Sequence, residues 1–141
     1  MQDASAEPRR LTVLVYASNP ETRDRVIRAL GEYPAPGIAI DPVALDTGGA
    51  TIARLDAGDV DLAILDGEAA PIGGMGVARQ IKDEIDNPPP VVLLVARRDD
   101  AWLATWSRAE AVVPHPVDPV TLANAVSALI EGQAAPATAA H

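Results

Sequence analysis

Three short runs of apolar residues constrain the fold of this chain more than any other feature. They are LTVLVYA (11–17), VDLAILD (60–66) and VVLLVA (91–96). An almost unbroken apolar run of this length is typical of a strand buried on both faces, as in a parallel sheet covered by helices. We therefore expect these three runs to form strands of a parallel sheet.

The segments between these runs carry apolar residues at helical spacing. Helices are predicted at 21–32, 48–58, 75–85, 99–109 and 120–130, and two further strands at 38–46 and 109–114. Strands that alternate with helices predict a single α/β domain. The expected fold is (βα)5 and flavodoxin-like, with a five-stranded parallel sheet and helices on both faces. We expect it to span 10–131, between disordered tails at 1–9 and 132–141.

Charge and composition exclude several classes of function. The chain has a formal net charge of −9 and no cysteine. A net negative charge disfavours nucleic acid and anionic membrane surfaces, because both bind proteins largely through lysine and arginine. No apolar run approaches the roughly 20 residues that span a bilayer, and the first residues do not resemble a secretory signal. We therefore expect a cytoplasmic protein with no disulfide, no bound nucleic acid and no membrane insertion.

Asp66 is the candidate functional residue that the strand pattern singles out. It ends a predicted buried strand, and ligands of parallel α/β sheets bind beyond the carboxyl ends of the strands. The simpler interpretation is a polar strand end that caps nearby backbone N–H groups. A single carboxylate seldom catalyses without a partner, so we expect no enzymatic activity.

Three stretches resemble the receiver domain of bacterial two-component response regulators. They are NPETR (19–23), DLAILDGEAAPIGGMGVARQIK (61–82) and HPVDPVTLANAV (115–126). The resemblance implies that Asp66 is at the phosphoacceptor position and that Gly74 is the family's loop glycine, with Pro71 one residue later than the usual proline. It also implies a cis peptide bond between His115 and Pro116.

The chain departs from the receiver pattern at five positions that surround the phosphoacceptor. In receivers an acidic pair after the first strand helps to hold Mg²⁺, and Ala17 and Ser18 align with that pair. Ala96 aligns with the family's Ser or Thr, His115 with its Lys, and Val112 with its switch aromatic. Mg²⁺ prefers carboxylate oxygens, so the resemblance implies an atypical receiver without a cofactor. Weak Mg²⁺ binding is expected only under the alternative in which Asp66 is a phosphoacceptor.

His115 has two interpretations in this alignment. It is either a loop histidine fixed by its proline neighbours or a pH-sensitive partner of Asp66, because the family's Lys approaches the phosphoacceptor. An unperturbed histidine titrates near pH 6.5, whereas a lysine stays charged at neutral pH.

Trp102 and Trp106 are four residues apart and therefore share a helix face. They belong either to the core or to a binding surface. In receivers the fourth helix, last strand and fifth helix form the partner-binding face, which would include Val112. The same face is where a homodimer is expected.

Three hypotheses for the function remain. The first is a stand-alone atypical receiver that acts as a phosphorylation-independent protein–protein interaction module. Its partner would be another protein, whose identity the sequence does not give, and a further alternative is an accessory role in a large complex such as respiratory NADH dehydrogenase. The second is a single-domain response regulator in a two-component phosphorelay, phosphorylated on Asp66. The third is an unrelated small flavodoxin-like enzyme or ligand binder, which would need a pocket with converging polar groups.

Overall fold

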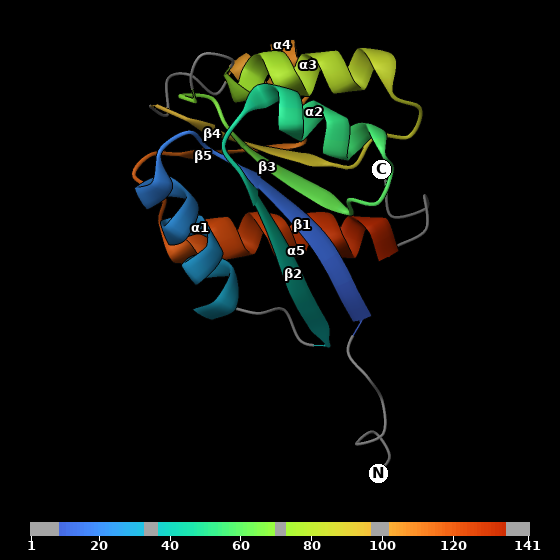
Figure 1. Ribbon diagram of the computed structural model, residues 1–141. Coiled ribbons are helices and arrows are strands. Elements are labelled where there is room, and N and C mark those ends of the chain that lie inside the picture. The colour runs from blue at the N-terminus through green and yellow to red at the C-terminus, as the bar shows by residue number, and fades with distance from the viewer. Residues whose placement is uncertain (1–8, 33–36, 70–72, 97–101, 135–141) are drawn as a thin grey trace.

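The fold is a parallel β-sheet with helices on both faces (Figure 1). The computed structural model describes residues 9–32, 37–69, 73–96 and 102–134. The strands are β1 (Arg9–Tyr16), β2 (Ile38–Leu45), β3 (Leu62–Asp66), β4 (Val91–Val95) and β5 (Ala111–Pro114). The helices are α1 (Pro20–Glu32), α2 (Gly48–Asp56), α3 (Gly74–Glu84), α4 (Trp102–Ser107) and α5 (Pro119–Ala134).

The five strands form one sheet in the order β2-β1-β3-β4-β5, and every neighbouring pair is parallel. Every residue of β3 and β4 is buried, as the continuous apolar runs predict. Strand β2 is at the edge of the sheet and is only half-buried. An edge strand tolerates a proline, which explains why β2 continues through Pro42. The predicted fold class is therefore confirmed.

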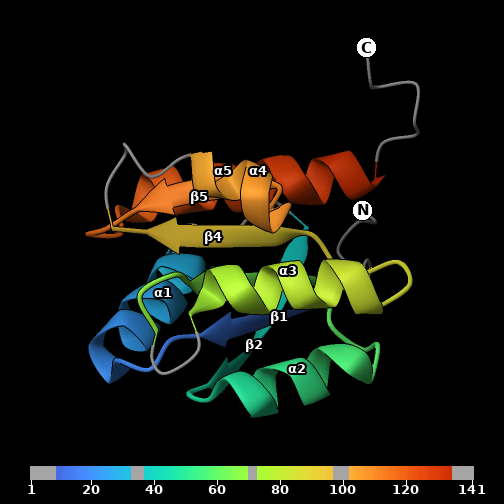
Figure 2. The ribbon, with the colours of Figure 1, turned by 90° about the horizontal axis from the view of Figure 1, so that it is seen from above.

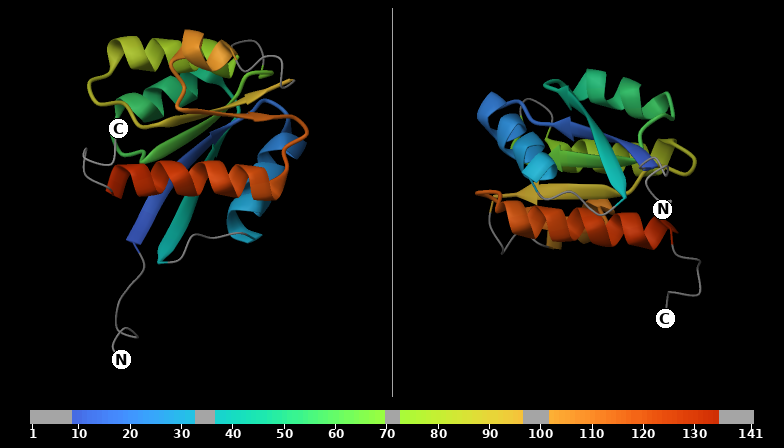
Figure 3. Two further views of the ribbon diagram at one scale, coloured as in Figure 1. Left: turned by 180° about the vertical axis from the view of Figure 1, so that it is seen from behind. Right: turned by 90° about the horizontal axis from the view of Figure 1, so that it is seen from below.

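The helices form two layers that bury opposite faces of the sheet. Helices α1 and α5 lie together on one face, where Val26, Leu122 and Val126 pack against the sheet (Figure 3). Helices α2 and α3 cover the other face, where Leu55 and Ile81 are buried, and α4 lies beside α3 (Figure 2). Within the described ranges, no helix is both long enough and apolar enough to cross a membrane.

The observed elements differ from the predicted bounds at several ends. Strand β1 begins at Arg9 and helix α5 ends at Ala134, slightly beyond the expected span of 10–131. Helix α2 is shorter than predicted because Gly58, just beyond its end, has a φ of 84°, which a helix does not allow. The predicted helix at 99–109 is observed only from Trp102, because residues 97–101 lie outside the described part of the chain.

Side-chain caps fix the start of α1 and of α5. Asn19 Oδ1 accepts a hydrogen bond from the Glu21 N–H at 2.8 Å. Asp118 Oδ2 accepts from both the N–H and the hydroxyl of Thr121, each at 2.9 Å. These bonds satisfy backbone donors that a helix leaves open in its first turn. The two hydrogen bonds from Thr121 lower the pKa of the Asp118 carboxyl, and the bond from the backbone N–H has the larger effect.

Lys82 ties the end of α3 to the loops before β4 and β5. Its Nζ lies 2.7 Å from Glu110 Oε2 and 3.3 Å from the Pro89 carbonyl oxygen. The other carboxylate oxygen of Glu110 accepts from the Val91 N–H at 2.6 Å. Only 9% of the Lys82 side chain is exposed, whereas 37% of the Glu110 side chain is exposed, so the lysine is shielded from water and its partner is not.

Candidate functional site

Asp66 ends β3, the middle strand, at the edge of the sheet where the carboxyl ends of all five strands meet. The residue is buried, with 3% of its surface exposed. Its carboxylate Oδ1 accepts from the Glu68 N–H at 2.9 Å, and its carbonyl accepts from the Ala69 N–H at 3.1 Å. Asp66 therefore caps the loop that follows it, as the simpler interpretation predicts.

Gly67 and Gly74 allow close approaches of the backbone beside Asp66. A Cβ on Gly74 would lie 2.8 Å from the backbone carbon and oxygen of Asp66. A Cβ on Gly67 would lie 2.7 Å from the carbonyl oxygen of Leu94. Neither distance leaves room for a side chain, so both positions need glycine to hold Asp66 in place. Pro71 lies outside the described residues.

His115 reaches Asp66 from the loop between β5 and α5. Its Nε2 lies 2.9 Å from Asp66 Oδ1, and the side chains are 22% and 4% exposed, respectively. An ionised carboxylate has only acceptor oxygens, so Nε2–H of the imidazole is the donor of this hydrogen bond when Asp66 carries its charge. The His115 N–H donates to the Val95 carbonyl at 2.7 Å, and the bond to Pro116 is cis, as the resemblance implies. The structure thus joins two residues whose contact the sequence left open.

The loop between β1 and α1 lies beside this pair and carries Ala17 and Ser18. Ala17 is fully buried, and its N–H donates to the Leu45 carbonyl at 3.2 Å. Arg23 Nη1 donates to the Ala17 carbonyl at 2.7 Å and more weakly to the Ser18 carbonyl at 3.4 Å. The Arg23 contact was not anticipated from the sequence. An arginine in the first turns of a helix, where the helix dipole disfavours a cation, was the available signal.

A magnesium ion, which the resemblance implies for a phosphorylated site, does not fit the residues present. Neither Ala17 nor Ser18 supplies a carboxylate, and both of their carbonyl oxygens face Arg23. Asp66 Oδ1 already has two hydrogen-bonding neighbours. In the described ranges, no group of three or more His, Asp or Glu side chains is arranged to hold a metal ion. Mg²⁺ requires oxygen ligands in near-octahedral geometry, which this arrangement lacks.

Two further residues flank Asp66 on the neighbouring strands. Ala96 follows β4 and has no hydroxyl to offer a phosphoryl group. Tyr16 ends β1 next to Leu65 of β3 and is fully buried. Burial raises the pKa of the Tyr16 phenol, and the negative charges of Asp66 and Asp46 raise it further. Sequence reasoning did not anticipate Tyr16, although its place at the end of a buried strand beside β3 was the available signal.

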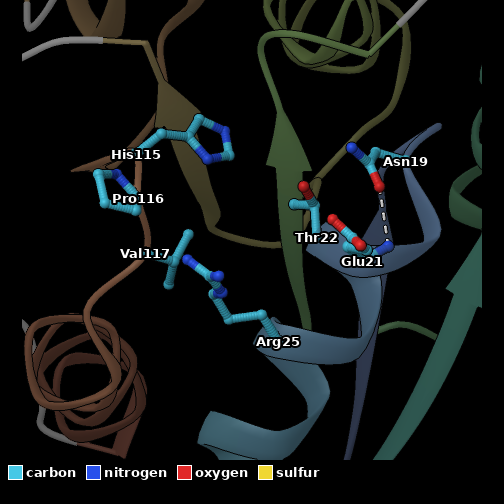
Figure 4. A pocket seen from close by; sticks show the side chains of 7 residues that line it. All are labelled: Asn19, Glu21, Thr22, Arg25, His115, Pro116 and Val117. Atoms are coloured by element: carbon cyan, nitrogen blue, oxygen red, sulfur yellow. Dashed lines mark hydrogen bonds between the residues drawn. The ribbon is translucent and has the colours of Figure 1, made fainter.

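An open cavity of about 350 Å³ lies between the start of α1 and the loop after β5 (Figure 4). Its lining consists of Asn19, Glu21, Thr22, Arg25, His115, Pro116 and Val117. Figure 4 shows Arg25 extending from α1 toward the loop side of the cavity. Glu21 and Arg25 place opposite charges on the wall of this cavity. His115 also lines the cavity, and its ring contacts the buried Asp66.

Both tryptophans of α4 are exposed. Trp102 is 64% and Trp106 is 45% exposed. Trp106 lies on the α3 side of its helix, because the guanidinium carbon of Arg79 sits 4.7 Å from its ring centroid and Arg79 Nη1 donates to the Trp106 carbonyl at 2.8 Å. Val112 of β5 is half-buried and packs against the core on the same side of the sheet. The exposed aromatic surface of α4 therefore borders α3.

Comparison with curated proteins finds relatives of nearly the same length. They are the uncharacterized response regulatory proteins MT3230 and Rv3143, from two strains of Mycobacterium tuberculosis. Each is 52% identical to this chain over 125 residues, which cover 88% of this chain and 94% of the relative. No protein-family model matches the chain.

Solved structures of receiver domains share the fold. The receiver domain of the response regulator NarL from Mycobacterium tuberculosis has a TM-score of 0.73 and 24% identity, covering 89% of this chain and 99% of that one. The Francisella response regulator 1452 receiver has a TM-score of 0.71 and 16% identity, with 87% and 98% covered. The response regulator TrrA of Thermotoga maritima, solved with Mg²⁺–BeF, has a TM-score of 0.69 and 27% identity, with 84% and 98% covered.

The likeness to these structures establishes the fold, and the identity to the mycobacterial relatives extends over most of both chains. The fold is the flavodoxin-like fold of receiver domains, and the chain belongs to the response regulators.

Proposed function

We propose that this chain is an atypical receiver that works without phosphorylation, by binding another protein. One observation carries the proposal: the Asp66 carboxylate is buried and hydrogen-bonded to His115 and to the Glu68 N–H, beside a loop that supplies no second carboxylate. A carboxylate is a weak nucleophile and needs activation before it attacks a phosphoryl group. Metal ions commonly neutralise the charge that develops in phosphoryl transfer, and the donors around Asp66 do not suit one.

A receiver that is not phosphorylated would act by binding another protein. Trp102 and Trp106 expose aromatic surface on α4, and tryptophan is enriched at the residues that contribute most to binding energy. The net charge of −9 favours a partner with a basic surface. The partner would be another protein in the cytoplasm, and a component of a large complex such as respiratory NADH dehydrogenase is one candidate. A homodimer through α4, β5 and α5 is the alternative use of this surface.

A second candidate function is phosphorylation of Asp66 in a two-component relay. The position of Asp66 at the end of β3 favours it, as does the likeness to TrrA, which was solved with Mg²⁺–BeF. In that case a kinase would phosphorylate Asp66, and Mg²⁺ would bind weakly beside it.

Amide NMR distinguishes the two candidates. The protein is titrated first with Mg²⁺ and then with beryllium fluoride, which mimics an aspartyl phosphate, and the Asp66→Asn variant serves as the control. We expect no saturable shifts around Asp66. Saturable shifts that disappear in Asp66→Asn would overturn the proposal and support the phosphoacceptor.

The interaction surface is tested with a pull-down that compares matched variants. Trp102→Ala and Trp106→Ala remove exposed side chains of α4, whereas Arg28→Ala removes an exposed side chain of α1, outside the face formed by α4, β5 and α5. We expect a partner that the wild-type chain and Arg28→Ala both retain and that the tryptophan variants lose. A partner retained equally by all variants would place the binding surface elsewhere.

A further inference from the structure

Arg23 is bound to the loop that, in receivers, carries the metal-binding acidic pair. Its Nη1 lies 2.7 Å from the Ala17 carbonyl oxygen and 3.4 Å from that of Ser18. These are the two residues that stand at the acidic positions. The positively charged guanidinium of Arg23 therefore binds the backbone carbonyl oxygens of this loop.

The start of α1 directs Arg23 back to this loop. The Arg23 N–H donates to the Asn19 carbonyl at 3.1 Å, and Asn19 Oδ1 caps the Glu21 N–H, so the first turn is fixed. Side chains of a helix tilt toward its N-terminus, and a long arginine at this position therefore returns toward the residues just before the helix.

The position is electrostatically unusual for a cation. The N-terminus of a helix carries a partial positive charge, which disfavours arginine in the first turns. Guanidinium stays charged at all accessible pH values, so Arg23 needs acceptors close by. The carbonyl oxygens of Ala17 and Ser18 supply them, and the half-buried contact is partly shielded from water.

We propose that Arg23 is a built-in cation that holds the β1–α1 loop through its backbone carbonyls, so that the shape of this loop depends on an arginine and not on a divalent ion. The inference deepens the proposed function, on which it rests, by naming what stabilises the loop where receivers carry their acidic pair. It assigns Arg23 a positioning role: the side chain fixes Ala17, whose N–H donates to Leu45, and thereby the strand end next to Asp66.

The first test measures hydrogen exchange in Arg23→Gln against Arg28→Gln. Arg28 is an exposed arginine of the same helix, so its replacement makes the same change in charge away from the loop. Because charge-assisted hydrogen bonds are among the stronger ones, we expect the Ala17 amide to exchange about tenfold faster in Arg23→Gln than in the wild type. The Arg28→Gln variant should match the wild type. Equal exchange in both variants would overturn the proposal.

The second test asks whether Arg23 competes with a metal ion. The double variant Ala17→Asp, Ser18→Asp restores the acidic pair, and its affinity for Mg²⁺ is measured by NMR titration with Arg23 present and with Arg23→Gln added. Removing a competing cation should tighten Mg²⁺ binding about tenfold, whereas Arg28→Gln in the same background should have much less effect. If Arg23→Gln and Arg28→Gln increase the affinity for Mg²⁺ equally, Arg23 acts only through its general charge, and the proposal is refuted.

The two proposals fail in distinguishable ways. Shifts around Asp66 on adding beryllium fluoride to the wild type would contradict phosphorylation independence. An Arg23→Gln variant that behaves like Arg28→Gln would contradict the role of Arg23 and leave the phosphorylation-independent function standing.

Discussion

The hydrogen bond between His115 and Asp66 is the contact whose removal should have the clearest effect on stability. The variant His115→Ala deletes the imidazole and leaves the buried Asp66 carboxylate with the Glu68 N–H. A hydrogen bond to a charged group contributes about 1.5–3 kcal/mol, and breaking a fully buried charged pair costs about 3–5 kcal/mol. Because the His115 side chain is 22% exposed, water can partly replace it. We therefore expect a loss of about 2 kcal/mol in the free energy of unfolding.

Urea unfolding followed by circular dichroism measures this loss, and the melting temperature should fall by about 7 °C for a domain of this size. The variant His115→Gln is the matched control, because its side-chain amide can still donate to Asp66. It should lose less than about half as much stability as His115→Ala.

A double-mutant cycle with Asp66→Asn separates the contact from other effects of the histidine. We expect a coupling free energy of at least about 1 kcal/mol between the two positions. If His115→Ala is equally destabilising in the wild type and in Asp66→Asn, the pair does not interact energetically and the reasoning fails.

Three further variants test other parts of the structure. Gly74→Ala places a Cβ 2.8 Å from the Asp66 backbone and should destabilise the fold by about 1–3 kcal/mol in urea, whereas an unchanged midpoint would contradict the tight loop. Asp118→Ala removes a cap whose pKa is lowered by Thr121, so its stabilisation is present above the unfolded pKa and lost as the pH falls through the folded pKa. Its melting temperature should therefore lie below the wild-type value at pH 7, and this deficit should shrink as the pH falls through the folded pKa of Asp118; a deficit that does not change with pH would contradict the cap. Trp102→Ala, at a side chain that is 64% exposed, should leave the free energy of unfolding within about 0.5 kcal/mol, and a larger loss would show that Trp102 packs against the fold.

The sequence predicts the elements of this fold because each central strand is a continuous apolar run. Burial of every residue in β3 and β4 follows directly from that pattern. The order of the strands does not, since apolar spacing shows which residues are buried but not which strands are neighbours. The order was accessible only through the receiver resemblance.

The sequence predicts where Asp66 lies in the fold, but it does not predict which residues contact Asp66. The parallel sheet places Asp66 at the edge where ligands bind, yet His115 is 49 residues further along the chain and reaches it through a loop conformation and a side-chain rotamer. Neither is encoded in local spacing. The same holds for Trp106, because a short helix such as α4 has too few turns to fix its rotation, and only the packing of Arg79 shows that it borders α3.

Lys82 has a practical consequence for anyone who labels or immobilises this protein. It is the single lysine in the sequence, and its amine is engaged by Glu110 and the Pro89 carbonyl. A reagent or an acetylating enzyme must first draw the amine out of both contacts, and acylation would then separate the end of α3 from the loops before β4 and β5. Amine-directed biotinylation or cross-linking at Lys82 should therefore be slow, and where it succeeds it would loosen the fold that it was meant to report on.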